Sequence, residues 1–295
     1  MGKLSVVIST YNGEGKIEEC LKSVSFADEI ILINNSSTDK TVEIAQKYTS
    51  KIFQRPNNPM LNVNKNFGFS KASGDWILSL DDDERVTPKL KEEIQEVLRS
   101  SVFKNGYRIP RKNIIFGKWI QHAGWYPDYQ LRLFRKGKGE FAKKHVHEML
   151  SLEGEPGTFS GDLMHLNYES VSQFLDKMIR IYTTSEAQHL INNGYEFKLS
   201  DSIKMPTQEF LRRFFLQKGY KDGAHGLILS LLMSFYHLVV FAKLWEINKF
   251  KDSEENSLLI FEEEFRNVKK EVDYWVDKEN GKLVKNLFKR ILRFK

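Results

Sequence analysis

The sequence contains a single cysteine, Cys20, among its 295 residues. One cysteine can form neither an intramolecular disulfide nor a cysteine-based zinc site, so both kinds of cross-link are excluded. A chain of this length buries roughly 70–75% of its unfolded surface and therefore needs no such cross-link to fold. The near absence of cysteine predicts a reduced, intracellular protein, or one that is indifferent to oxidation.

The sequence also lacks a secretory signal, internal repeats and low-complexity linkers. Because no apolar segment of about 7–15 residues follows the N-terminal Met-Gly-Lys, we expect the chain to begin in the cytoplasm. Hydrophobic residues make up 41% and charged residues 28%, a balance that excludes collagen-like, coiled-coil and wholly disordered chains. The net charge of +6 favours anionic partners such as nucleotides, lipid headgroups or nucleic acid, without choosing among them.

Short apolar runs alternate with helical segments in the first third of the chain. The runs predicted as buried strands are Leu4–Ser9, Glu29–Asn34 and Trp76–Leu80. The segments predicted as helices are Glu14–Ser25, Asp39–Tyr48 and Lys89–Arg99. Thr87 is expected to cap the last helix, with Pro88 at its first position. This β-α-β-α-β order predicts an α/β fold with a mainly parallel sheet and right-handed crossovers.

The pattern changes to strands and then helices after residue 110. Two further strands, Tyr107–Pro110 and Leu131–Arg135, are expected to extend the same sheet. From Val171 onward the chain is predicted to be helical. We place a domain boundary near residue 168, which separates a sheet domain over residues 1–168 from a helical region over residues 169–295.

Small hydrogen-bonding side chains follow the first two predicted strands. The first strand ends in Thr10-Tyr11-Asn12-Gly13, and the second continues into Asn34-Asn35-Ser36-Ser37-Thr38-Asp39. Ligands of parallel sheets bind beyond the carboxyl ends of the strands, so these side chains could bind a nucleoside. Ordinary turn formation and helix capping is the alternative interpretation of the same residues.

Four carboxylates, Asp81-Asp82-Asp83-Glu84, follow the third predicted strand. Mg²⁺ or Mn²⁺ would offset their repulsion, because these cations take carboxylate oxygens together with substrate phosphates and neutralise a leaving diphosphate. We expect Asp81 and Asp83 to point to one side and bind the cation, which leaves Asp82 or Glu84 for a role other than metal binding. The alternative is a solvated acidic loop that caps the next helix.

Aromatic, basic and histidine residues occupy the segment between residues 117 and 165. The stretch Gly117–Asp128 carries aromatic side chains with polar tips that suit sugars, although a tryptophan pair is equally typical of a core. His145, His147 and Glu148 together could supply a general base, a metal ligand and a phosphate contact, but a His-X-His pair also arises often by chance. His165 follows two apolar residues and is interpreted as a core histidine.

Taken in order, these segments resemble the family 2 glycosyltransferases, and among them the β-glucosyltransferases of the lipopolysaccharide core and cell envelope. The likeness covers roughly residues 1–250. No single segment is specific, but their ordered agreement is. The matching segments include Leu4-Ser-Val-Val-Ile-Ser-Thr-Tyr-Asn12, Ala27-Asp-Glu-Ile-Ile31, Ser37-Thr-Asp-Lys-Thr41, Lys65-Asn66, Leu80-Asp-Asp-Asp-Glu-Arg85, Gly124-Trp-Tyr-Pro-Asp128, Leu131-Arg-Leu-Phe-Arg135, Val146-His-Glu148 and Lys221-Asp-Gly223.

The resemblance implies a GT-A fold that binds a nucleotide-sugar donor and a divalent cation, Mg²⁺ or Mn²⁺. It implies a catalytic carboxylate at Glu148, and we expect metal contacts from Asp81, Asp83 and His147. Family members commonly read the base with a carboxylate at the position of Asn34 or Asn35, where this chain has amides, and a UDP-sugar is the expected donor. The donor-binding residues that we expect are Thr10, Tyr11, Asn12, Asn34, Asp39, Lys65, Asp82 and Arg132.

Two helical segments near the C-terminus could contact a membrane. The apolar stretch Gly226–Ala242 spans about 25 Å, which is short of a hydrocarbon core of roughly 30 Å, so we do not interpret it as a membrane span. A buried helix and an in-plane membrane helix remain open for it. The last segment, Gly281–Lys295, carries six basic residues and no acidic one, which suits an anionic membrane surface. Its alternative is a solvated helix docked on the preceding helices.

The function predicted from these features is inverting sugar transfer. The acceptor would be a lipid-linked or cell-envelope glycan at the inner face of the cell membrane, with Glu148 taking the hydroxyl proton. Nucleotidyl transfer is the alternative enzyme class, and the lack of a glycine-rich phosphate loop argues against it. A nucleic-acid-binding or anionic-lipid-binding protein is the third class, and confinement of the tail's basic charge to one amphipathic helix disfavours nucleic acid.

Overall fold

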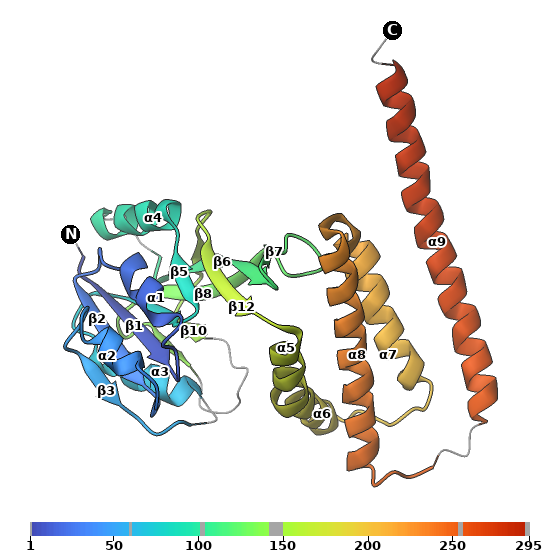
Figure 1. Cartoon of the computed structure of the whole chain (residues 1–295), viewed down its shortest axis with the longest axis horizontal. Coiled ribbons are helices and arrows are strands. Elements are labelled where there is room, and N and C mark those ends of the chain that lie inside the picture. Colours follow the sequence, from blue (N-terminus) through green and yellow to red (C-terminus); the bar gives the residue numbers. More distant parts are fainter. Residues whose placement is uncertain (1, 59–60, 101–103, 142–149, 253–255, 293–295) are drawn as a thin grey trace. The chain divides into compact units, whose positions relative to one another are not determined.

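A computed structural model describes residues 2–58, 61–100, 104–141, 150–252 and 256–292 (Figure 1). The chain divides into two compact units. The first unit comprises Met1–Gln121 and Trp125–Glu169, and the second comprises His122–Gly124 and Ser170–Lys295. The first unit is built from a sheet and helices, and the second unit is helical.

A ten-stranded sheet forms the centre of the first unit, in the order β3-β2-β1-β4-β8-β6-β12-β5, with β7 and β11 paired to β6. The first four strands in this order are parallel to one another: β1 (Leu4–Thr10), β2 (Glu29–Asn34), β3 (Ile52–Gln54) and β4 (Trp76–Asp81). Beyond β4 the sheet is mixed, because β8 is antiparallel to β4 and β6 whereas β12 is parallel to β6. The bounds of the other strands in this sheet are β5 (Glu84–Val86), β6 (Gly106–Ile115), β7 (Lys118–Trp119), β8 (Asp128–Arg135), β11 (Gly157–Thr158) and β12 (Leu163–Tyr168). Strands β9 (Gly139–Phe141) and β10 (Leu150–Leu152) pair separately.

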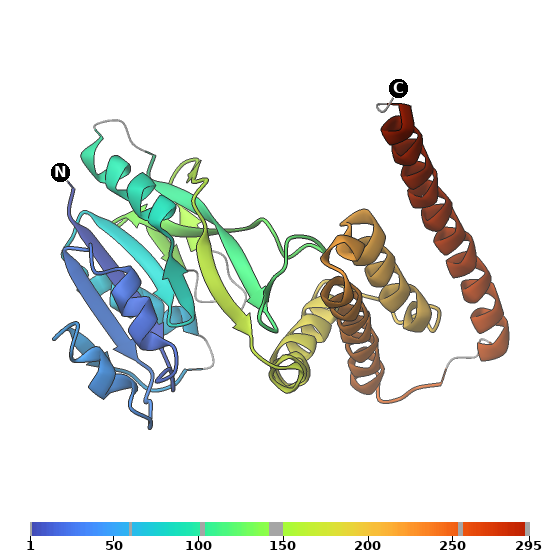
Figure 2. The ribbon, with the colours of Figure 1, turned by 45° about the horizontal axis from the view of Figure 1, so that its top comes forward.

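Helices cover both faces of this sheet (Figure 2). Their bounds are α1 (Ile17–Ser23), α2 (Thr41–Ala45), α3 (Leu61–Lys71) and α4 (Pro88–Arg99). Successive strand residues point to opposite faces, so Val6 and Ile8 of β1 pack with α1, α2 and α4 while Val7 packs with α3. Burial on both faces explains the unbroken apolar run of β1. The α/β fold class predicted from the sequence is confirmed.

The predicted helices are confirmed, although two of them are shorter than expected. Thr87 caps α4 as predicted, because its Oγ1 accepts a hydrogen bond from the Leu90 N–H at 3.4 Å. Helices α1 and α2 begin later than predicted, after loops whose N–H groups bind side chains. The Glu14 N–H donates to Asp39 Oδ2 and the Lys40 N–H donates to Glu14 Oε2, so both loops are tied to each other.

The sequence patterns missed β3 and α3, which lie between α2 and β4. Strand β3 has only three residues at the sheet edge, and none of them is fully buried. Helix α3 contains three asparagines and Gly68, residue types with low helix propensity. Gly68 lets the helix approach the sheet closely, since a Cβ there would lie 2.5 Å from Val7 Cγ1. Tertiary packing therefore forms a helix that propensity does not predict.

The second unit is helical, as predicted for the chain after Val171. Residues His122–Gly124 belong to it, and the His122 N–H donates to Asp222 Oδ2 at 2.8 Å. Its helices are α5 (Val171–Lys177), α6 (Thr183–Asn192), α7 (Asp201–Leu211), α8 (Ala224–Ile247) and α9 (Ser257–Leu292), with π-helical turns at Met178–Tyr182 and Arg212–Leu216 and a 3₁₀ turn at Gly219–Asp222.

Helix α8 is longer than its sequence pattern indicated. The apolar stretch of 17 residues continues into a helix of 24 residues, which is about 36 Å long. Among the described residues it is the one helix whose length and composition would allow it to cross a membrane, although core helices of soluble proteins meet the same criteria. The length argument against a membrane span was therefore wrong, because the flanking residues extend the helix.

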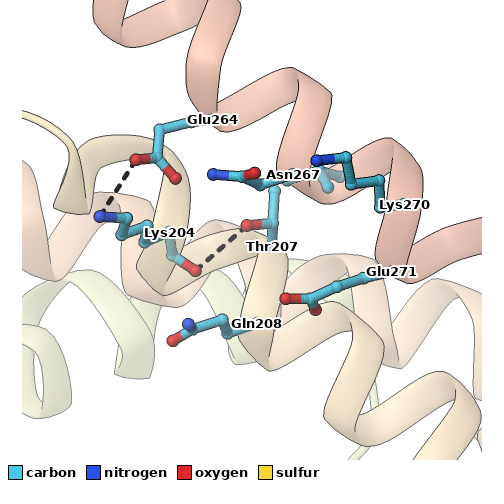
Figure 3. Close-up of a pocket in the computed structure, with 8 residues that line it drawn as sticks. Lys204, Thr207, Gln208, Glu264, Asn267, Lys270 and Glu271 are labelled. Atoms are coloured by element: carbon cyan, nitrogen blue, oxygen red, sulfur yellow. Dashed lines mark hydrogen bonds and ion pairs between the residues drawn. The ribbon is translucent and has the colours of Figure 1, made fainter.

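Helix α9 meets α7 along a narrow polar contact (Figure 3). Lys204 of α7 pairs with Glu264 of α9 at 3.0 Å, and Thr207 Oγ1 donates to the Lys204 carbonyl at 3.1 Å. A cavity of about 340 Å³ lies beside this contact, lined by polar and charged side chains such as Gln208 and Glu271. Most of the α9 side chains that are described remain exposed.

Candidate active site

The carboxyl ends of β1, β2 and β4 bring three predicted segments to one edge of the sheet. In the strand register Thr10 lies opposite Asn34, and Ser9 lies opposite Asp81. The turn between β4 and β5 contains Asp82 and Asp83, so the acid cluster stands directly beside the loop that follows β1. This is the edge at which parallel α/β sheets bind their ligands.

Asp81 is held by two cationic side chains. Lys65 Nζ lies 2.6 Å from Asp81 Oδ1, and Arg132 Nη2 lies 2.9 Å from Asp81 Oδ2. Burial acts to raise the pKa of Asp81, but these two cations outweigh it and hold the pKa well below its ordinary value. Lys65 and Arg132, predicted as donor contacts, are themselves almost fully buried, at 7% and 5% exposure. Their pairing follows from the cost of leaving a buried carboxylate without a counter-charge.

Glu84 completes this buried ionic cluster, a role that its sequence pattern does not define. It is fully buried, its Oε1 lies 2.6 Å from Arg132 Nη2, and its Oε2 accepts the Asp81 N–H at 3.0 Å. Burial acts to lower the pKa of Arg132, but the charges of Glu84 and Asp81 raise it above its ordinary value. Glu84 therefore fixes both the side chain of Arg132 and the backbone of the acid turn.

Asp82 turns back toward the loop after β1. Thr10 Oγ1 donates a hydrogen bond to Asp82 Oδ2. Burial, together with the like charges of Asp83 and Asp81, raises the pKa of Asp82 to about 6, although the Thr10 hydrogen bond opposes this. Gly13 permits the approach, because a Cβ at that position would lie 2.3 Å from Asp82 Oδ2.

Asp83 faces His165, which lies on the antiparallel neighbour of β5. Asp83 Oδ1 lies 3.6 Å from His165 Nε2. This oxygen is buried and accepts no hydrogen bond from the residues that the structure describes. The Leu166 N–H donates to the Asp83 carbonyl at 2.9 Å, so strand β12 and the acid turn are joined next to the pair.

Asn113 determines which His165 nitrogen carries the proton. Asn113 Nδ2 donates to the Trp125 carbonyl at 2.8 Å and lies 3.4 Å from Asp128 Oδ2, so its Oδ1 faces His165. That oxygen accepts from His165 Nδ1 at 2.7 Å. In neutral His165 the proton is then on Nδ1, and the lone pair of Nε2 points toward Asp83. A histidine oriented in this way by a second-layer carbonyl is the usual arrangement for metal ligation.

The loops that follow β1 and β2 are tied together by side-chain caps. Asn12 Oδ1 accepts the Thr38 N–H at 2.9 Å, and Asp39 accepts the N–H groups of Glu14 and Thr41. Asp39, predicted near the nucleoside, thus holds the loops in place. Asn12, predicted as a donor contact, also has a loop-joining role.

The two remaining predicted donor contacts differ in exposure. Asn34 is 1% exposed, and its amide is used inside the protein: Nδ2 donates to Gln54 Oε1 at 2.6 Å, and Oδ1 accepts the Ser37 N–H at 3.1 Å. Tyr11 is 49% exposed at the same edge of the sheet. Asn34 therefore supports the loop from within, and Tyr11 is open to a ligand.

This edge belongs to a segment with a recognisable family match. Residues 5–149 match the model of the family described as Glycosyl transferase family 2. The chain carries a family 2 glycosyltransferase domain. The protein is accordingly a glycosyltransferase, and the resemblance inferred from the ordered motifs is confirmed.

Relatives extend this likeness over most of the chain. The lipopolysaccharide core biosynthesis glycosyltransferase LpsC of Rhizobium meliloti is 26% identical over 84% of this chain and 94% of its own length. A GalNAc(5)-diNAcBac-PP-undecaprenol beta-1,3-glucosyltransferase of Campylobacter jejuni is 28% identical over 62% of this chain and 65% of its own length. Among solved structures, S. aureus TarS 1-349 in complex with UDP covers 86% of this chain and 93% of that chain, with 15% identity and a TM-score of 0.41.

Three of the predicted residues of the glycosyltransferase domain fall in a segment that the structure does not describe. Glu148 and His147, predicted as catalytic base and metal ligand, lie outside the described residues, as does His145.

No group of three or more His, Cys, Asp or Glu side chains converges within the described ranges, so the four acids do not together surround one metal ion there. Their carboxylates diverge because each has its own partner, and Asp81 and Asp83 do not share one.

The sequence analysis missed His165 and Asn113. His165 is buried at 9% exposure, as expected of a core histidine, but it faces an acid of the site. The only signal was its place in a strand, since Leu163-Met-His-Leu-Asn-Tyr168 could be a sheet element. Its neighbours, Asn113 on β6 and Glu84 on β5, follow from strand pairing and are not encoded in the local pattern.

Proposed function

We propose that this glycosyltransferase moves a sugar from a UDP-sugar to a hydroxyl of a glycan or glycolipid acceptor, with inversion at the anomeric carbon and with a divalent cation. The observation that carries the proposal is the Asp83 and His165 pair at the ligand-binding edge of a family 2 domain. Two relatives favour an envelope acceptor, because one is named for lipopolysaccharide core biosynthesis and the other for transfer to a glycan on PP-undecaprenol.

Asp83 and His165 are the residues that would hold Mg²⁺ or Mn²⁺. Asp83 Oδ1 accepts no hydrogen bond from the described residues, and Asn113 orients the His165 ring beside it, so the two side chains together suit metal ligation. Carboxylate oxygens and substrate phosphates together suit these cations. When bound, the cation would neutralise charge on the departing diphosphate. We therefore assign the metal contacts to Asp83 and His165, and not to Asp81, whose oxygens are already paired with Lys65 and Arg132.

The polypeptide supplies the rest of the binding site. Lys65 and Arg132 keep Asp81 ionised and fixed, and the Glu84 carboxylate fixes the turn that carries Asp83. The capped loops after β1 and β2 form a rigid rim on which Tyr11 is exposed, and the nucleoside would lie along this rim. Such preorganisation lowers the cost of holding the donor in a reactive geometry.

Sugar transfer requires a base that takes the proton of the acceptor hydroxyl. The acceptor oxygen forms a bond to the anomeric carbon while the bond from that carbon to the diphosphate oxygen breaks, and the hydroxyl proton passes to a carboxylate. We assign this carboxylate to Glu148, on the family resemblance and its place beside His147 in the sequence. Asp128 is less suited, because Arg111 pairs with it and helps hold its pKa below the ordinary value against the effect of burial.

The enzyme would work at the inner face of the cell membrane. A glycan carried on a lipid reaches a cytoplasmic enzyme only at that surface. The exposed apolar side chains of the second unit and the basic C-terminal segment both suit an anionic bilayer.

Calorimetric titration of UDP, with Mn²⁺ or with EDTA, tests the donor and cation sites. We expect Asp83→Asn to weaken Mn²⁺-dependent UDP binding at least about 100-fold, since it removes the charge of a direct ligand. Glu153→Gln is the matched control, because Glu153 is an exposed acid of the same unit that pairs with Lys138. Wild-type UDP affinity in Asp83→Asn would contradict the metal assignment.

The donor base is tested separately with a panel of nucleotide sugars and Mn²⁺, by following release of nucleoside diphosphate. We expect release from a UDP-sugar and not from GDP- or CDP-linked sugars. Turnover of another nucleotide sugar alone would show that the base assignment is wrong while leaving sugar transfer intact.

A further inference from the structure

Helix α8 presents a continuous row of apolar side chains to solvent. We call this row the α8 stripe, and it consists of Leu227, Ile228, Leu231, Phe235, Leu238, Ala242 and Trp245. Successive members are one, three or four residues apart, so they lie on one side of the helix over about 27 Å. The six larger side chains are each between 38% and 48% exposed.

The opposite side of α8 is already occupied by its own unit. Val240 and Leu244 pack against Ala187 of α6, and Phe241 packs against Phe197 with ring centroids 5.1 Å apart and the rings tilted by 31°. Ser234 Oγ donates to the Pro206 carbonyl of α7 at 2.7 Å. The helix is therefore anchored along one side, while the stripe keeps much of its apolar surface exposed.

The chemistry of the stripe fits hydrocarbon better than a protein partner. Residues 224–242 contain no Lys, Arg, Asp or Glu, so the row offers no charged group with which a protein partner could set its register. Protein interfaces of comparable size carry about one hydrogen bond per 100–200 Å². Contiguous exposed apolar patches mark interaction surfaces.

Basic side chains at both ends of the stripe favour an anionic bilayer. Lys218 and Lys221 precede the helix, Lys249 and Lys251 follow it, and all four are exposed. The exposed acids Glu246 and Asp252 lie beside the second pair, so the positive charge is concentrated at the N-terminal end of the helix. Trp245 closes the stripe at its C-terminal end, where an aromatic ring with a polar edge suits the boundary between headgroups and acyl chains.

Packing argues against insertion of α8 across the bilayer. Helix α7 runs along α8, and Glu209 of α7 is paired with Arg213 and lies 3.8 Å from His237 of α8. A membrane-crossing α8 would carry this charged cluster into the hydrocarbon core, which is costly.

We propose that the α8 stripe lies in the plane of an anionic membrane and holds the enzyme at its lipid-linked acceptor. The stripe enters the region between headgroups and acyl chains, while the four terminal lysines contact the headgroups. This surface gives the membrane association included in the proposed function a specific location, and it does not depend on the identity of the donor.

Cosedimentation of the full-length protein with vesicles tests the surface. Vesicles of phosphatidylcholine alone are compared with vesicles that contain equal amounts of phosphatidylcholine and phosphatidylglycerol. We expect the wild type to prefer the anionic vesicles, and Leu231→Gln with Leu238→Gln to bind them at least about tenfold more weakly. Both leucines are more than 40% exposed, so the double variant should fold.

The matched control is Leu258→Gln with Leu259→Gln at the start of α9, where the leucines are 71% and 62% exposed. We expect this variant to bind within about twofold of the wild type. Equal binding by the stripe variant and the wild type, or equal loss in both variants, would overturn the assignment to α8.

Two further measurements distinguish membrane binding by the stripe from dimerisation and from donor binding. If the wild type sediments as a dimer without lipid, does not bind vesicles, and the stripe variant is monomeric, the stripe binds a second copy and the membrane proposal is wrong. UDP titration with Mn²⁺ should give the same affinity in all variants. Failure of the wild type to bind UDP would overturn the donor proposal and leave the vesicle result unaffected.

Discussion

The two units of the molecule place their large apolar side chains differently. Of the 20 large hydrophobic residues that are exposed in the described part of the chain, 18 lie in the second unit. The two in the first unit are Tyr11 and Tyr129. The sheet is covered on both faces, and its exposed edge gathers charged and polar groups. The first unit therefore gathers polar groups at one edge of its sheet, whereas the second unit exposes most of the large apolar side chains.

The contrast makes a general prediction about variants. Changes at the strand edge should alter donor binding or turnover without affecting vesicle binding, and changes on the exposed helices should do the reverse. The following predictions test that separation, beginning with the largest expected effect.

Glu148→Gln should lower turnover by at least about 100-fold, as expected for loss of a general base, with UDP affinity and vesicle binding unchanged. Steady-state kinetics with a UDP-sugar and an envelope glycan acceptor provides the measurement. Glu140→Gln is a suitable control because Glu140 is an exposed acid of β9. Near-normal turnover in Glu148→Gln would assign the base to a different carboxylate.

Glu29 should make the first unit sensitive to acid. Burial acts to raise its pKa, but Lys51 and hydrogen bonds from Ser5 and Ser73 lower it to about 2. Because an unfolded glutamate titrates near pH 4.3, the ionised side chain stabilises the folded state above that pH, and this contribution disappears as the pH falls toward 2. It amounts to at most about 3 kcal/mol.

Urea unfolding of the wild type and Glu29→Gln measures this contribution. The variant should be less stable at pH 7, and the difference should shrink as the pH is lowered from 5 to 2.5. Glu29 lies at the start of β2, at the end remote from the acid turn, so UDP affinity should be unchanged. A stability difference that does not depend on pH would show that the pKa of Glu29 is not lowered.

Asn113→Leu should weaken Mn²⁺ binding by about tenfold, as is typical when the second-layer partner of a metal ligand is lost. The leucine is close in size to the amide but cannot accept the His165 Nδ1–H, so the lone pair of Nε2 is no longer fixed toward Asp83. Asn167→Leu is the matched control, since Asn167 Nδ2 also donates to Asn113 Oδ1, at 3.3 Å, but the change leaves the bond between Asn113 and His165 in place. Equal Mn²⁺ affinity in both variants would exclude the positioning role.

Much of the first unit could be predicted from the sequence because its strands are continuous apolar runs. Residues 4–10, 29–34 and 76–81 are buried on both faces, so their boundaries coincide with changes in polarity. The carboxyl ends of parallel strands must then meet, which placed Thr10, Asn34 and the acid cluster together correctly. The mixed half of the sheet was less predictable, since β5 has only three residues and pairs with β12 across a long stretch of sequence.

The site itself was harder to predict, for a physical reason. A local pattern identifies charged residues but not the partners that neutralise them. Lys65 and Arg132 were predicted as donor contacts, which stays a prediction, but their pairing with Asp81 was not predicted. His165 was expected in the core and is buried, but its position beside Asp83 was not predicted. Both outcomes depend on contacts between elements that are far apart in sequence.

The smallest effect is expected from the basic segment at the C-terminus. Gly281–Lys295 carries six basic residues, each of which contributes about 1 kcal/mol near an anionic surface before screening. At physiological salt the Debye length of about 8 Å reduces that attraction considerably. Deleting the segment should therefore weaken binding to phosphatidylglycerol vesicles only a few-fold, compared with about tenfold for the stripe variant.

Truncation before Gly281 preserves the contacts that join α9 to its unit. Trp275 stacks on Phe215, and Tyr220 Oη donates to Glu279 Oε2 at 2.7 Å, so both contacts precede the deletion. Vesicle binding by the truncated protein should depend much less on salt, because the deletion removes charge. Vesicle binding by the stripe variant should still depend on salt, because that change removes only apolar surface. Vesicle sedimentation at 0.05 and 0.5 M salt separates the two contributions. If truncated and full-length proteins bind equally at both salt concentrations, the basic segment has no role at the membrane, and the apolar stripe with its four lysines must account for all of the attraction.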